Sequence, residues 1–354
     1  RICETLMLLR TKYSFNGYIH VKAIPGAPDE LLSRAGYLAD RVSINLELPT
    51  AQSLSKLAPN KSFKTILEPM EKITGTIAAN RLALGKEARM ERSSINRYLT
   101  GSIFNQNGTD NGQAALSGTQ RTALESGDKL SLPAVSKDMC VKRPFAPAGQ
   151  STQMIIGATP ETDLTLIRTT QHLYKNYDLK RVFYSAYIPL NEDSALPQLD
   201  ADVPLLREHR LYQADWLLRF YGFQADELLS ESRPNFNEQL DPKCDWAIRH
   251  LGQFPVEVQN ASYDMLLRIP GIGPKSARRI VETRRYAKLD FDILKKIGVV
   301  LKRAHYFITC NGRMMYRIPI EESYITECLT DDNHKENWEI THQNEKYQQL
   351  SLFE

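Results

Sequence analysis

The amino-acid sequence predicts an α/β fold with a parallel sheet in the first half of the chain, followed by a small all-α domain. Four strand-like segments occur before residue 190, and helix-like segments separate them, which predicts the parallel sheet. The turn Pro270–Gly273 lies between two helix-like segments, which predicts the helical domain. A composition of 42% hydrophobic and 25% charged residues excludes a wholly disordered, collagen-like or membrane-embedded chain.

The elements of the first half follow in order. The chain opens at Arg1 inside a helix-like segment, so we expect a part of the protein to precede it. A helix cap and first-turn proline are expected at Thr159–Pro160. The expected strands are Tyr18–Ile24, Val42–Leu48, Gln153–Gly157 and Arg181–Ile188. The expected helices are Asp29–Ala39, a long one from Phe63 past Leu84, the one that follows Pro160, and Pro204–Phe220, for which docking on the sheet domain is favoured over phosphate binding.

These elements predict four parts of the chain. Residues 1–190 form the sheet domain, 191–254 a helical linker, 255–312 the helical domain, and 313–354 an acidic tail. Residues 105–137 are rich in Gly, Ser, Thr, Asn and Gln and lack an apolar period, which predicts a disordered surface insertion.

The expected strand Val42–Leu48 alternates apolar and polar residues. Ser43, Asn45 and Glu47 fall on the same face, opposite the apolar positions. A strand inside a parallel sheet is usually apolar on both faces, so a polar face suits a barrel lumen that holds a polar ligand. An edge strand with one wet face is the alternative.

Four long segments resemble one known family: Tyr18–Ala27, Ser43–Pro49, Pro147–Glu161 and Pro204–Arg219. The chain is similar over nearly its whole length, apart from 105–137, to radical-SAM proteins of DNA modification and repair that are associated with uracil-DNA glycosylase partners. The resemblance implies a partial radical-SAM (β/α) barrel. It also implies S-adenosylmethionine and a [4Fe–4S] cluster as cofactors, with cysteine cluster ligands that lie outside this chain.

The resemblance also implies cofactor contacts. Ser43, Asn45 and Glu47 match the strand that contacts the amino-acid and ribose parts of S-adenosylmethionine, and Gly157 and Tyr187 lie where the adenine is flanked. The five cysteines are far apart and include no CxxC pair, so this chain is expected to be inactive alone. The same spacing argues against a disulfide scaffold or a zinc ribbon and favours the cytoplasm.

Residues Val258–Val281 resemble a helix-hairpin-helix of DNA-repair proteins. Gly271 and Gly273 permit a close approach of the turn to a ligand, and Pro274 begins a helix whose N-terminus favours phosphate. Phe291–Ala304 looks like a degenerate second copy. The expected DNA-binding residues are Gly271, Gly273, Lys275, Ser276, Arg278, Arg279, Gly298, Lys302 and Arg303.

The charge pattern supports this reading. Between Met265 and Arg303, eleven Lys or Arg residues face three acids, whereas from Arg317 to Glu354 three basic residues face nine acids. Such a basic block is typical of a nucleic-acid surface that contacts phosphates rather than bases. A solvated helix face, or a hairpin used for protein contacts, is the alternative.

The last residues resemble the peptide with which bacterial repair and replication proteins bind the sliding clamp. Its expected contacts are Gln349, Leu350, Leu352 and Phe353, on a tail that is otherwise polar and acidic. The alternative is that the apolar residues fold back on the chain. Together these patterns predict a radical-SAM enzyme of DNA repair or modification, with a non-catalytic DNA-binding adaptor as the competing class.

Overall fold

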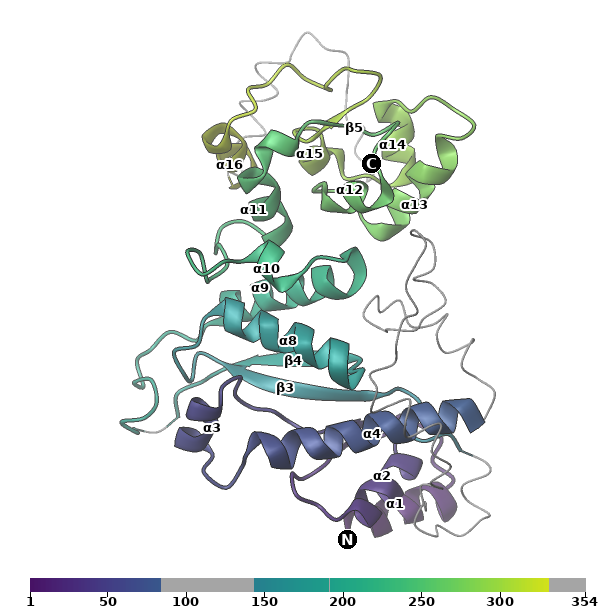
Figure 1. Cartoon of the computed structure of the whole chain (residues 1–354), viewed down its shortest axis with the longest axis vertical. Coiled ribbons are helices and arrows are strands. Elements are labelled where there is room, and N and C mark those ends of the chain that lie inside the picture. The colour runs from purple at the N-terminus through teal and green to yellow at the C-terminus, as the bar shows by residue number, and fades with distance from the viewer. Residues whose placement is uncertain (84–142, 191, 331–354) are drawn as a thin grey trace, which may run out of the picture. The chain divides into compact units, whose positions relative to one another are not determined.

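The computed structural model describes residues 1–83, 143–190 and 192–330. The chain divides into two compact units, Arg1–Phe236 and Asn237–Glu354 (Figure 1). The boundary between them falls inside the segment expected to be a linker. The insertion expected at 105–137 and the tail beyond residue 330 lie outside the described residues.

The first unit is built on a four-stranded parallel sheet, in the order β1-β2-β3-β4. The strands are β1 (His20–Lys22), β2 (Arg41–Ser43), β3 (Gln150–Ile156) and β4 (Arg181–Ala186). The helices of this half are α1 (Ile2–Thr11), α2 (Asp29–Leu38), α3 (Ala51–Leu57), α4 (Phe63–Ala83) and α8 (Asp163–Tyr177). The α/β class and the parallel sheet are therefore confirmed.

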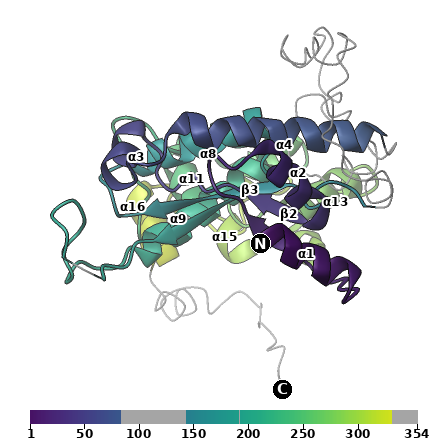
Figure 2. The ribbon, with the colours of Figure 1, turned by 90° about the horizontal axis from the view of Figure 1, so that it is seen from below.

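Helices α3 and α4 lie along one side of this sheet (Figure 2). Val42, Met154 and Val182 are each at most 1% exposed, as are Ile66 and Met70 of α4. Parallel strands require such crossover helices, and burial of their apolar faces provides the core of the unit.

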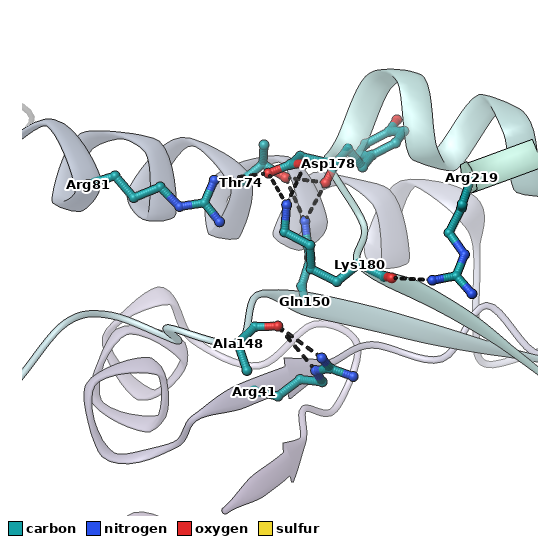
Figure 3. Close-up of polar contacts among 9 residues, drawn as sticks. Arg41, Thr74, Arg81, Ala148, Gln150, Asp178, Lys180 and Arg219 are labelled. Atoms are coloured by element: carbon teal, nitrogen blue, oxygen red, sulfur yellow. Dashed lines mark hydrogen bonds and ion pairs between the residues drawn. The ribbon is translucent and has the colours of Figure 1, made fainter. Parts of the chain in front are cut away.

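Polar contacts join α4 to the amino-terminal ends of the strands (Figure 3). The Gln150 side-chain amide donates to the carbonyl oxygens of Met70 and Tyr177 at 3.0 and 2.9 Å. Asp178 pairs with Arg81 of α4 at 3.3 Å and with Lys180 at 3.0 Å. These contacts fix the position at which β3 and β4 begin beneath the helix.

Side chains close the outer edge of β4. The Val182 N–H donates to the Tyr174 hydroxyl and the Tyr184 N–H to the Tyr212 hydroxyl, each at 3.0 Å. The Ala186 N–H donates to the Glu208 carboxylate at 2.6 Å. The Tyr212 hydroxyl also donates to the Tyr184 carbonyl at 2.8 Å. The sheet therefore ends at β4.

Two of these edge residues, Tyr212 and Glu208, belong to α9 (Leu205–Trp216), which continues into the π-helix η2 (Leu217–Tyr221) and is followed by α10 (Ala225–Leu228). Arg207 of α9 pairs with buried Asp163 at 2.6 Å. Arg207 thus bonds another part of the first unit, and α9 packs on β4 and α8 as expected for a docked helix.

The second unit contains helices and one very small sheet. Its helices are α11 (Pro242–Arg249), η3 (Leu251–Gln253), α12 (Tyr263–Arg268), α13 (Pro274–Thr283), α14 (Phe291–Ile297), α15 (Leu301–Ala304) and α16 (Glu322–Thr330). Strands β5 (Val256–Glu257) and β6 (Ile308–Thr309) pair in parallel, so the expectation of an all-α domain is corrected. The Glu257 carboxylate accepts hydrogen bonds from Thr309 and Gly312, which holds these ends together.

Two local expectations are wrong. The strand expected over Val42–Leu48 ends at Ser43, and Glu47 has a positive φ of 67°, which breaks the alternation of its side chains. The helix α8 is capped by Thr162, not by Thr159. In the part of the chain that the structure describes, no helix is both long and apolar enough to cross a membrane.

Candidate nucleic-acid interface

The first hairpin consists of α12, a short turn and α13. Ser262 caps α12 by accepting the Met265 N–H at 3.1 Å, and the helix ends before Pro270. Gly271 has a φ of +80°, which glycine adopts without the strain of a side chain. Gly273 is the N-cap residue of α13 and Pro274 its first residue. The turn and the start of the second helix at Pro274 thus match those expected from the sequence.

A second hairpin repeats this arrangement with α14 and α15. Asp290 caps α14 by accepting the Ile293 N–H at 2.7 Å, and Gly298 ends it at a φ of +98°. The corresponding residues of the two hairpins are Gly271 and Gly298, Ile272 and Val299, Lys275 and Lys302, and Ala277 and Ala304. The apolar members of these pairs are all buried. Val300 stands where the first hairpin has Gly273.

The two turns are bonded to each other. The Val300 N–H donates to the Gly271 carbonyl at 2.9 Å, and the Ser276 hydroxyl donates to the Gly298 carbonyl at 2.8 Å. The Arg279 guanidinium donates to the Ile297 carbonyl at 2.9 Å. The turns therefore form one continuous structure that presents the N-termini of α13 and α15.

The expected DNA-binding residues divide into two groups. Lys275, Arg278 and Lys302 are exposed, and each is a free-standing candidate for contact with a phosphate. Ser276, by contrast, is only 8% exposed and bonds the second turn, as Arg279 does. Arg303 pairs with the Asp241 carboxylate at 3.0 Å. The acceptors of Ser276, Arg279 and Arg303 lie far from them in the sequence, so no local sequence pattern predicts these contacts.

Pattern analysis of the sequence missed the contribution of α11. Asp241 caps this helix by accepting the N–H groups of Lys243 and Cys244, each at 3.1 Å. The Lys243 ammonium donates to the Ile272 carbonyl, in the first turn, at 2.6 Å. The Asp-Pro pair at 241–242 is a helix-start signature that predicts α11, but not its contact with the hairpin.

The expected cofactor residues lie in the first unit. Ser43 and Asn45 are 3% and 6% exposed, and the Asn45 side chain donates to Gln153 at 3.4 Å. Glu47 pairs with Lys61 at 3.3 Å, next to the break in the strand. Ser43 is level with Ser151 in the sheet, and both hydroxyls are buried without a hydrogen-bond partner among the described residues.

The other two cofactor candidates lie at the carboxyl ends of β3 and β4. Gly157 has a φ of +88°, and a Cβ atom there would come within 2.7 Å of Pro204 Cγ, so the chain itself occupies the space beside it. The Tyr187 N–H donates to the Ile156 carbonyl at 2.8 Å. Among the residues that the structure places, no group of three His, Cys, Asp or Glu side chains is positioned to hold a metal ion.

Comparison with known proteins supports the hairpin. Residues 256–283 match the helix-hairpin-helix motif, which is the segment from β5 to the end of α13. No curated protein and no solved structure matches the chain. The motif suggests DNA as the partner of the second unit.

Proposed function

We propose that the second unit binds the phosphate backbone of DNA through its two bonded hairpins, with little dependence on base sequence. The observation that carries this proposal is the Gly271–Gly273 turn at the N-terminus of α13, since N-terminal N–H groups and the helix dipole favour a phosphate. Lys275 and Arg278 on α13 and Lys302 on α15 are exposed beside these turns and would neutralise phosphates.

The test is a titration of labelled duplexes of different sequence over a range of salt concentrations. We expect similar affinities for all sequences and a steep fall with salt. A salt-independent affinity, or no binding even at low salt, would contradict phosphate recognition by this unit.

A second candidate function is that of a radical-SAM enzyme of DNA repair or modification. Its support is the sequence resemblance, together with the polar face on which Ser43 and Ser151 have buried hydroxyls without described partners. Strands β1–β4 contain no Asp or Glu. The uncharged side chains of Ser43 and Asn45 would therefore hold the polar parts of S-adenosylmethionine. With the cluster, this cofactor would supply reductive cleavage chemistry; the cluster ligands are expected outside this chain.

The fit of these residues to S-adenosylmethionine is partial. Ser43 at the end of β2 offers a hydroxyl and Asn45 in the segment after it an amide, but Pro204 fills the space beside Gly157. Iron and sulfide analysis of the full-length gene product, with an assay for 5′-deoxyadenosine under reducing conditions, distinguishes the enzyme from a non-catalytic DNA-binding adaptor. Absence of both cluster and 5′-deoxyadenosine would favour the adaptor.

Two protein partners belong to the same proposal. A uracil-DNA glycosylase-like protein follows from the resemblance alone. The sliding clamp follows from Gln349, Leu350, Leu352 and Phe353, which lie outside the described residues. A pull-down with the clamp of the same organism, comparing the intact chain with one that ends at Gln348, tests the second partner; equal capture of both chains would remove it.

A further inference from the structure

Lys243 lies beneath the first hairpin turn, although it precedes the matched motif in the sequence. It is the second residue of α11, its side chain is buried, and its ammonium nitrogen donates to the Ile272 carbonyl at 2.6 Å. Ile272 stands between the two glycines of the turn and is itself 1% exposed. A buried lysine thus bonds the backbone of the proposed phosphate-binding turn from the inside.

This hydrogen bond orients one peptide group of the turn. In a trans peptide, the carbonyl of Ile272 and the N–H of Gly273 point in opposite directions. Because Lys243 holds the carbonyl toward the interior, the Gly273 N–H is directed away from it, at the N-terminus of α13. Lys243 is therefore a positioning residue for the N–H groups that favour an anion.

The charge of Lys243 is sensitive to its surroundings. Burial lowers the pKa of its ammonium from the ordinary value to about 7. The nearby Asp241 and Cys244, both beside it on α11, favour the charged form, whereas Arg268 of α12 opposes it. At neutral pH the side chain is thus divided between its charged and neutral forms, and either form can donate to the Ile272 carbonyl.

We propose that binding of a DNA phosphate at the Gly271–Gly273 turn draws a proton onto Lys243, so that DNA binding is coupled to proton uptake near neutral pH. The coupling rests on the proposed DNA-binding function. A phosphate at the turn is a negative charge on the other side of the Ile272–Gly273 peptide group from Lys243, and through this short separation it favours the protonated form of the lysine. By linkage, protonation must in turn strengthen binding by the same factor.

The sign of the pH dependence follows. Below about pH 7 the free protein already carries the charged form, and affinity is highest. As the pH rises through this value, Lys243 of the free protein loses its proton, and DNA binding must be accompanied by uptake of that proton. The affinity therefore falls, by up to about tenfold for each unit by which the phosphate raises the pKa of Lys243.

The experiment is calorimetric titration of the full chain with a short duplex at neutral pH, in two buffers of different protonation enthalpy. The wild-type chain should take up protons on binding, and its affinity should decrease from about pH 6 to about pH 9. Lys243→Met keeps most of the apolar stem of the side chain but removes the amino group, with its charge and its hydrogen bond to the Ile272 carbonyl, and should abolish both effects. The matched control is Lys275→Met, an exposed cation of the same hairpin, which should weaken binding and retain both effects.

The outcomes separate the two proposals. No binding by the wild-type chain at low salt overturns DNA binding, and with it the coupling. Binding without proton uptake overturns the coupling alone, as does proton uptake retained by Lys243→Met, which would assign the proton to another group. If Lys243→Met does not fold, the NMR titration of the Lys243 ε-methylene in the wild-type chain replaces it: an apparent pKa that DNA leaves unchanged overturns the coupling.

Discussion

The main-chain N–H of Val300 donates to the carbonyl oxygen of Gly271 at 2.9 Å, so that the turn of one hairpin is bonded directly to the turn of the other. A Cβ atom at Gly271 would lie 2.4 Å from the Val300 carbonyl oxygen. The close approach of two backbones, as well as the positive φ, therefore requires glycine at this position.

Gly271→Ala should destabilise the second unit by about 2–4 kcal/mol, because the strain of the left-handed conformation adds to a clash with backbone that cannot easily move. Gly312→Ala is the matched control. Gly312 has a φ of +73° but nothing within 4 Å of its Cβ position, so its replacement should cost about 1 kcal/mol from strain alone. Chemical denaturation of both variants measures the difference; equal losses would show that the contact with Val300 is unimportant.

Ser276→Ala should lower the free energy of unfolding by about 1 kcal/mol, because the Gly298 carbonyl loses its hydroxyl donor. Its DNA affinity should keep the salt dependence of the wild-type chain, since no charge is removed. Denaturation and DNA titration of the same preparation check both statements. A large change in the salt dependence with unchanged stability would instead place Ser276 in direct contact with phosphate.

Lys275→Met and Lys302→Met should each reduce the slope of log affinity against log salt by about one, because each removes one exposed cation from corresponding places in the two hairpins. Thermal unfolding should be almost unchanged in both. If only Lys275→Met changes the slope, the second hairpin does not contact DNA. Fluorescence anisotropy at several salt concentrations measures these slopes.

Tyr212→Phe should destabilise the first unit by about 1–3 kcal/mol, because it leaves the N–H and the carbonyl of Tyr184 without their partner at the edge of β4. Tyr286→Phe is the control, since Tyr286 is 89% exposed and its hydroxyl is free to bond with water. Denaturation of both variants provides the comparison, and similar stabilities would argue that water replaces the tyrosine hydroxyl.

Local patterns of the sequence predict the longer helices of the first unit, the approximate positions of the four strands and the glycine turn, because each depends on neighbouring residues. They do not predict where α8 begins. The expected cap is Thr159, whereas the helix begins after Thr162, where the Asp163 carboxylate accepts hydrogen bonds from Arg207 at 2.6 Å and from the Phe236 N–H at 3.0 Å. These two distant contacts fix the first residue of the helix, and no nearby pattern encodes them.

The candidate interface shows the same division. The basic residues and both turn glycines are visible in the sequence, whereas the hydrogen bond from Lys243 to Ile272 joins residues that only the tertiary fold brings together. Ser276 and Arg279 lie among cations and resemble ligand contacts, but their acceptors belong to the second hairpin. Composition therefore identifies the basic surface, whereas the fold shows which of its side chains also bond the protein: Ser276 is buried, and Arg279 is bonded but remains exposed.

The closed edge of β4 also bears on self-association. An exposed strand edge is a template on which a second molecule can add a strand, the usual first step of domain swapping and of amyloid-like aggregation. Along β4 the N–H groups that would recruit such a strand are already bonded to Tyr174, Tyr212 and Glu208. A neighbouring copy would have to break these hydrogen bonds before it could add a strand to this edge.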